Sequence, residues 1–237
     1  MIPDAEVHVF HKALEALAVL QTNPAGLGLF AVETTDWDGL DYIPEILGGG
    51  RVSRVIIVSG RMDLRTLRGL RDTRFSGFLD ATTANEIELR HAISEVVAGR
   101  RYLGRGIAEA FQQCKARCGW DFLTPREQLC LSVLAAGHND EQAGDILGRS
   151  TDSIRGYRGR ITRNLGLEQR SELIVFGEAH NFVRFGPQRI LHPGFERELE
   201  RLGRMRDGWL MPAPPCVTPF RFAPGCSRSS DPRRDGA

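Results

Sequence analysis

The stretch that decides the fold lies at residues 123–182 and reads LTPREQLCLSVLAAGHNDEQAGDILGRSTDSIRGYRGRITRNLGLEQRSELIVFGEAHNF. Thr124 is followed directly by Pro125 and, three residues on, by Glu127. This spacing predicts a capping box with proline at the first helical position, and therefore the start of a helix. Gly137 supplies the left-handed residue at which that helix is expected to end.

Two more helices are expected directly after it. Residues 140–147 predict a short helix, residues 148–149 a tight turn, and Ser150 or Thr151 the cap of a third helix that runs to about Leu165. One third of the circumference of this third helix is apolar, which marks its core face. That face carries Ile154, Tyr157, Ile161 and Leu165.

Charge is distributed unevenly along the same stretch, although the whole chain has a formal net charge of only +1. The third helix and the turn before it hold five arginines against a single acid, Asp152, whereas residues 121–147 hold one arginine against five acids. The five arginines of the third helix and its turn are Arg149, Arg155, Arg158, Arg160 and Arg163. A concentrated positive field on one helix is what attraction to phosphate requires.

The stretch resembles the LuxR/NarL-type helix-turn-helix family over some 60 residues and without a gap. The resemblance rests on LTPRE, Gly137, Leu147, Ser150, Ser153-Ile154-Arg155, Ile161, Leu165-Gly166-Leu167, Arg170 and Glu172. It implies a transcription regulator with a helix-turn-helix core at residues 140–159. The second helix of this core, which is the third helix of the stretch, is then expected to lie in the major groove of double-stranded DNA.

Carried over residue by residue, the resemblance places Arg155 at a basic DNA-contacting position and Ser153 at a phosphate. The full set of expected DNA contacts is Thr151, Ser153, Arg155, Arg158, Arg160 and Arg163. The sequence departs from the family at Leu129, Glu141 and Tyr157. Glycines also stand at 156 and 159, on the face where base-reading side chains belong.

The first hundred residues alternate short apolar runs with helical patterns, which indicates an α/β domain with a parallel sheet. The expected strands are Glu6–Phe10, Leu27–Val32, Arg54–Ser59 and Phe75–Leu79. This half resembles a receiver domain of response regulators, with the flavodoxin-like fold, through Asp38-Gly39-Leu40, Ser59 and the segment from Gly77 to Leu103.

Receiver chemistry does not follow from that resemblance. The phospho-acceptor position falls on Ala31 and the expected lysine on Ala81. Neither alanine side chain has an oxygen or an amine, so control by aspartyl phosphorylation is not expected. Glu33, Asp36 and Asp38 are expected to be solvated loop acids rather than ligands of a cation.

The first receiver strand is also missing from the pattern. Its absence predicts an incomplete sheet, unless the second strand closes up against the third, another segment fills the gap, or the protein starts further upstream.

The predicted organisation is a degenerate receiver-like domain at 1–100, a linker helix at 101–120, a helix-turn-helix domain at 121–182 and a tail at 183–237. Prolines and arginines interrupt the tail throughout, and within it only residues 194–205 have a helical pattern, so it is expected to be disordered. Its positive charge adds phosphate attraction, or the tail has no role; the sequence leaves both open.

Composition excludes several other classes. The five cysteines match no zinc spacing, so we expect neither a metal nor a cofactor, and no enzymatic activity. Neither a membrane span nor a signal peptide is predicted, which favours the cytoplasm. A homodimer through Ser171–Ala179 is expected. The alternative is a protein-interaction module that binds a partner regulator, through the N-terminal domain and the acidic second helix, and has lost DNA binding.

Overall fold

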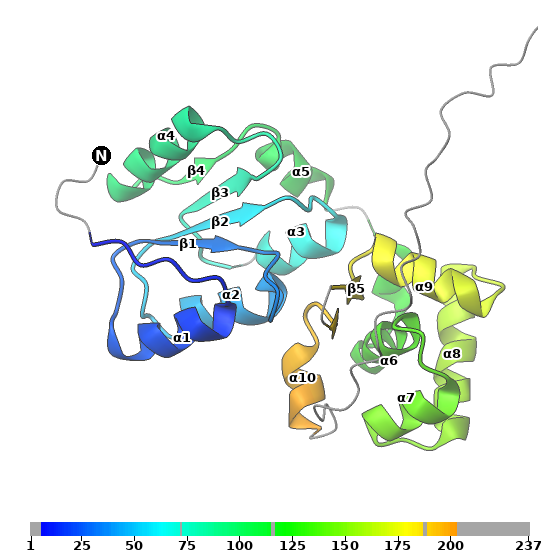
Figure 1. The fold of residues 1–237 in the computed structure, drawn as a ribbon. Coiled ribbons are helices and arrows are strands. Elements are labelled where there is room, and N and C mark those ends of the chain that lie inside the picture. Colours follow the sequence, from blue (N-terminus) through cyan, green and yellow to red (C-terminus); the bar gives the residue numbers. More distant parts are fainter. Residues whose placement is uncertain (1–5, 72, 115–116, 187–188, 203–237) are drawn as a thin grey trace, which may run out of the picture.

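The computed structural model describes residues 6–71, 73–114, 117–186 and 189–202. Four parallel strands form a sheet in the order β1-β2-β3-β4 (Figure 1). They are β1 (Gly28–Ala31), β2 (Val55–Ser59), β3 (Gly77–Asp80) and β4 (Tyr102–Leu103). β2 is apolar at consecutive positions because both faces of the sheet are covered: Val55 and Ile57 pack on one side and Ile56 on the other.

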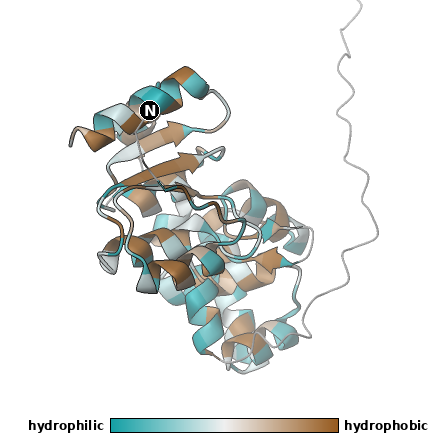
Figure 2. Cartoon of the chain, turned by 60° about the vertical axis from the view of Figure 1, so that its left-hand side comes forward, coloured by the Kyte–Doolittle hydropathy of each residue, from teal (hydrophilic) through white to brown (hydrophobic). Residues whose placement is uncertain are grey.

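Five helices cover the two faces unequally (Figure 1). One core cluster joins the sheet to α1 (Ala13–Thr22), α2 (Gly39–Gly48), α3 (Leu64–Arg71) and α5 (Ile107–Gln113). A second, smaller cluster joins the other face to α4 (Glu86–Val97) alone. The apolar strands lie between more polar helices in Figure 2. The α/β class predicted for this half is therefore confirmed.

Two expectations for this half need correction or refinement. Residues 6–10 pair with no strand in the part of the chain that the structure describes, and Val7 and Val9 are 77% and 75% exposed. The predicted strand at Glu6–Phe10 is therefore wrong, since a strand requires a hydrogen-bonded neighbour, and β1 lies at the edge of the sheet. The helix expected as a linker is the shorter α5, which packs into the core of the α/β domain through Ile107.

The helix-turn-helix domain predicted at 121–182 is all-helical, as predicted. A short 3-10 turn, η1 (Gly119–Phe122), precedes α6 (Pro125–Ala135), α7 (Asp140–Leu147), α8 (Thr151–Leu165) and α9 (Arg170–Ala179). Its core consists of fully or nearly fully buried apolar side chains from every one of these elements. They include Trp120, Leu131, Leu134, Ala143, Ile154, Ile161 and Leu173.

The predicted disorder of the tail is wrong for residues 183–186 and 189–202. Residues 183–186 and 189–202 hold β5 (Arg184–Phe185), which pairs antiparallel with β6 (Ile190–Leu191), and α10 (Glu196–Arg201). Val183, Leu191 and Leu199 are at most 1% exposed, because this segment packs between the two halves. We call residues 181–186 and 189–201 the C-terminal clasp. Residues 203–237, the rest of the predicted tail, lie outside the described residues.

Candidate nucleic-acid interface

The helix-turn-helix is built by local signals that the structure reproduces. The Thr124 hydroxyl accepts from the Glu127 amide at 3.3 Å, and the Glu127 carboxylate accepts from the Thr124 amide at 3.0 Å, so the predicted capping box is confirmed. Of the two residues predicted as possible caps of the third helix, Ser150 is the cap and Thr151 is the first helical residue. The Ser150 hydroxyl accepts from the amide of Ser153 at 3.2 Å.

The turn between α7 and α8 is tight because two glycines permit it. Gly148 takes the left-handed conformation at φ 64°. Gly144 allows the chain to fold back closely, since a Cβ on it would lie 2.7 Å from the Arg149 carbonyl oxygen. The sequence prediction identified the turn but not the requirement for glycine at 144.

The buried face of α8 is the predicted one. Ile154 and Ile161 are fully buried, and Tyr157 and Leu165 pack partly against the same core. The opposite face is exposed and carries Ser153, Arg155, Gly156, Gly159 and Arg163. Helix α8 itself lies on the side of the domain away from the sheet (Figure 1).

The six predicted contact residues occupy different environments. Arg155 is 63% exposed in its side chain and pairs with Asp152 on the same helix at 2.8 Å. Arg163 is exposed and has no acidic partner among the residues that the structure describes. Thr151 is half-buried at the first position of α8, and the Ser153 hydroxyl lies 2.9 Å from that of Ser150. These four residues lie along the exposed face and its N-terminal end.

The remaining two arginines form ion pairs with other helices of the same domain. Arg158 is 32% exposed and donates from Nε and Nη2 to the two carboxylate oxygens of Asp140, at 3.0 and 2.9 Å. Hydrogen bonding from Arg158 lowers the pKa of Asp140. Arg160 donates from Nε to Glu127 at 2.5 Å and lies over the ring of Tyr157. The acidic neighbourhood noted in the sequence thus neutralises part of the basic helix.

Burial raises the pKa of Glu127, but the hydrogen bonds from Arg160 and Thr124 outweigh it, so that the pKa lies below its usual value. Glu127 is therefore ionised at neutral pH and keeps Arg160 paired.

Arg149 was not among the predicted DNA contacts, but its position adds it to the candidate interface. It lies exposed in the turn, next to the start of α8, and has no acidic partner among the described residues.

The acids of the α/β domain have structural partners. Asp36 caps α1 by accepting from the amides of Ala13 and Leu14 at 2.9 and 3.0 Å. Glu33 accepts from the Ser59 hydroxyl at 3.1 Å. Asp38 is fully buried, and burial raises its pKa to about 6.

The expectation of solvated loop acids is therefore wrong for Asp38, while no cluster of three or more potential metal ligands occurs among the described residues. Ala31 ends β1, and its carbonyl oxygen accepts from the hydroxyl of Tyr42.

Helices α7 and α8, joined by their short turn and with one basic exposed face, define a helix-turn-helix domain. Residues 121–176 match the family described as bacterial regulatory proteins, luxR family. This region of the chain therefore belongs to the luxR family of helix-turn-helix domains.

Individual relatives match over different lengths. The transcriptional regulatory protein MctR of Rhizobium johnstonii is 28% identical over 96 residues, which cover 40% of this chain and 45% of MctR. The DNA-binding transcriptional activator DevR/DosR of Mycobacterium tuberculosis is 25% identical over 191 residues, or 73% of this chain and 83% of that protein.

Among solved structures, RcsB from Salmonella enterica serovar Typhimurium bound to promoter P1flhDC is 17% identical, covers 72% of this chain and 83% of its own, and gives a TM-score of 0.47. None of the helices in the described part of the chain combines the length and apolar character of a membrane span.

Proposed function

We propose that this protein binds double-stranded DNA through α8 and regulates transcription without phosphorylation of an aspartate. The observation that carries the proposal is the exposed face of α8, where Arg155 and Arg163 flank two glycines on a helix presented by a tight turn. An arginine fork matches the O6 and N7 acceptors of guanine, which makes Arg155 the expected base reader.

The start of α8 supports binding to phosphate. Thr151, Ser153 and the turn residue Arg149 lie at the positive end of the helix dipole. Together they form the phosphate-contacting part of the interface. Arg158 and Arg160 instead form ion pairs that join α8 to α7 and to α6, respectively. This division differs from the sequence prediction, which gave all four arginines of α8 to DNA.

Control by phosphorylation has no chemical basis at the position that the resemblance indicates. Ala31 has a methyl group there, and the nearby acids Asp36, Asp38 and Glu33 are engaged with amides, an arginine and a hydroxyl. A carboxylate held in this way is a poor nucleophile toward a phosphoryl donor.

Dimerisation through α9 completes the proposal. Val175 is 68% exposed in the middle of α9, with Ser171 and Ala179 exposed on the same helix. One short recognition helix gives limited affinity, and a second copy supplies a second half-site. Replacement of Val175 by Glu is expected to give a monomer in sedimentation experiments and to weaken binding to a duplex with paired sites. An unchanged dimer would place the interface elsewhere.

The experiment that tests DNA binding is selection of duplexes from a random-sequence pool, followed by titration of the selected duplex at increasing salt. A shared motif and an affinity that falls steeply with salt support the proposal. Failure to enrich any duplex favours the protein-interaction alternative.

A further inference from the structure

The C-terminal clasp belongs to the core of the DNA-binding domain. Phe182, Phe195 and Leu199 are at most 9% exposed and pack in the same cluster as α6, α8 and α9. The Ser132 hydroxyl of α6 donates to the Phe182 carbonyl oxygen at 2.6 Å and lies 2.8 Å from Nδ1 of His192. The clasp is therefore part of the packed core of the helix-turn-helix domain.

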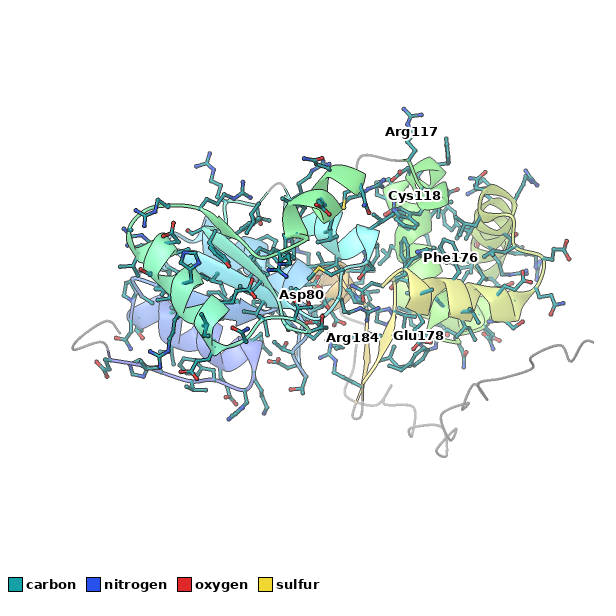
Figure 3. The ribbon with its side chains drawn as sticks, turned by 90° about the horizontal axis from the view of Figure 1, so that it is seen from above. Asp80, Arg117, Cys118, Phe176, Glu178 and Arg184 are labelled. Atoms are coloured by element: carbon teal, nitrogen blue, oxygen red, sulfur yellow. The ribbon has the colours of Figure 1, made fainter. Side chains whose placement is uncertain are left out.

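The same segment binds the α/β domain through polar groups that are buried. Arg184 donates to the Thr34 carbonyl oxygen at 2.6 Å and pairs with Asp38 at 3.3 Å, the two side chains being 15% and 0% exposed. Figure 3 shows Arg184 and Glu178 at the seam between the two domains. At Glu178, the carbonyl oxygen accepts from Arg61 of the α/β domain at 3.3 Å.

Asp41 of α2 makes a second connection across the seam. Its carboxylate accepts from the amides of Gly194 and Glu196 at 2.7 and 3.1 Å, so a residue of one domain caps α10 of the other. Gly194 has a φ of +77°, and a Cβ on it would lie 3.0 Å from Nη2 of Arg65. The backbone of the clasp is thus fitted closely to α2 and α3.

Arg65 of α3 lies against two aromatic rings of the clasp. Its guanidinium carbon lies 4.5 Å from the ring centre of Phe182 and 4.8 Å from that of Phe195, and its Nη1 donates to the Asn181 carbonyl oxygen at 2.6 Å. The Asn181 side chain donates in turn to the Thr66 hydroxyl at 2.8 Å. Interfaces held only by exposed polar groups separate readily, whereas this one also has buried polar contacts. Its buried atoms Asp38 Oδ2 and Arg184 Nη1 form the 3.3 Å ion pair without a hydrogen bond, and Asn181 Oδ1 has no hydrogen-bond partner among the described residues.

None of the hydrogen bonds, ion pairs and ring contacts described above for the seam involves α8. The elements packed most extensively against α8 are α6, α7 and η1, all within its own domain. In Figure 1, α7 and α8 lie on the outer side of the molecule, and the clasp and α9 lie toward the sheet. Docking of the two domains thus leaves Arg155 and Arg163 exposed.

We infer that the C-terminal clasp locks the two domains into one body that is already competent to bind DNA. In this arrangement the α/β domain fixes the position of the helix-turn-helix and does not cover α8. The DNA-binding part of this inference rests on the proposed function, and the lock stands on the seam alone.

The test uses the full-length chain with the double substitution Asp41→Ala and Arg184→Ala, which removes two of the connections described above and leaves those of Arg61 and Arg65. The matched control is Glu86→Ala with Arg90→Ala, since this pair also joins an acid to an arginine but lies exposed within α4, at 75% and 58%. Three quantities are measured: hydrogen exchange of residues 189–201, the radius of gyration in solution, and the affinity for a selected duplex carrying a single site.

The double variant is expected to exchange at least about tenfold faster in the clasp and to have a larger radius of gyration. Its single-site affinity is expected to stay within about twofold of wild type, and the control to match wild type throughout. If the double variant loses its helical circular dichroism, Asp41→Asn and Arg184→Lys are measured instead, with smaller changes in the same direction.

Unchanged exchange and radius in a folded variant would overturn the lock. A rise in single-site affinity of about tenfold or more would show that docking covers α8, and would overturn the competence of the docked state. A wild-type protein that binds no duplex would contradict the proposed function while leaving the exchange and scattering results to judge the lock.

Discussion

The guanidinium of Arg158 binds both carboxylate oxygens of Asp140, which ties the middle of α8 to the first residue of α7. Both partners belong to the helix-turn-helix, and their side chains are 32% and 15% exposed. The angle between the two helices, and hence the presentation of the exposed face, is held partly by this pair. An arginine in a basic helix can therefore serve the fold rather than the ligand.

Replacing Arg158 by Ala is expected to lower the free energy of unfolding by about 1 kcal/mol, since a partly buried, bidentate pair is lost and Asp140 keeps its desolvation cost. Arg155→Ala is the matched control, because Arg155 is 63% exposed and its loss should change stability by less than about 0.5 kcal/mol. Urea unfolding monitored by circular dichroism measures both. Equal losses in the two variants would contradict the division of roles.

Gly156→Ala and Gly159→Ala are each expected to raise the free energy of unfolding by about 1 kcal/mol, because glycine is a poor helix former. Both sites have room: a Cβ at Gly159 meets no atom within 4 Å, and at Gly156 the nearest is Nη1 of Arg160 at 3.7 Å. Gly144→Ala is the contrasting control, expected to destabilise through the Arg149 carbonyl oxygen 2.7 Å away.

Thermal unfolding of the three alanine variants gives the comparison. Destabilisation by Gly159→Ala would contradict this expectation and would show that the helix-turn-helix requires glycine there for its own fold.

The free energy of unfolding is expected to contain a contribution from Asp41 that falls as the pH rises from about 4 to about 7. Burial, with the charges of Glu196 and Asp38, raises the pKa of Asp41 from 3.8 to about 7 in the folded protein. Between these values the folded protein holds a proton that the unfolded chain has released, so raising the pH favours unfolding, and the loss is complete above about pH 7.

Asp41→Asn isolates this contribution from other titrating groups. His192, whose pKa burial lowers to about 3, acts in the opposite sense below pH 6.5, but it is present in both proteins. The stability of wild type relative to Asp41→Asn should therefore decrease between about pH 5 and about pH 8. A constant difference across this range would show that Asp41 titrates normally.

Treatment with acetyl phosphate and Mg²⁺ is expected to leave the protein unlabelled and its affinity for DNA unchanged. The reason is the methyl group of Ala31 at the acceptor position and the engagement of Asp36 and Asp38 in capping and pairing. Measurement of the intact mass detects an added phosphoryl group, including a labile acyl phosphate if the sample is kept cold. An acid-labile phosphoryl adduct on any aspartate of residues 1–100 would overturn the assignment of Ala31.

The helix-turn-helix could be predicted because its signals are local. The capping box at Thr124, the end of α7 at Gly148 and the apolar spacing of Ile154 and Ile161 are each set by residues close together in sequence. Side-chain periodicity and caps fix such elements almost independently of the rest of the chain, and the structure follows them closely.

The clasp could not be predicted, because the contacts that order it join residues far apart in sequence. Asp41 lies 153 residues from Gly194, and Arg184 lies 150 residues from Thr34. Composition indicated a proline- and arginine-rich tail, yet burial against two domains orders β5, β6 and α10 despite that composition. Long-range partners override local propensity here.

The same limitation explains the two errors of detail. Residues 6–10 alternate as a strand does, but pairing depends on a neighbouring strand that the structure does not place beside them. The arginines of α8 have the same local appearance, and only the fold shows that Glu127 and Asp140 face two of them.

The most direct test of the central claim measures the affinities of the full-length protein and of Arg155→Ala for two duplexes. One is the selected duplex, and the other is the same duplex changed at the guanine that Arg155 is proposed to read. Wild type should discriminate between the two duplexes by about 1–3 kcal/mol, and Arg155→Ala should lose that discrimination while binding the selected duplex more weakly by a similar amount. Fluorescence anisotropy at a fixed salt concentration gives all four values. Identical isotherms for wild type and Arg155→Ala would contradict sequence reading through α8.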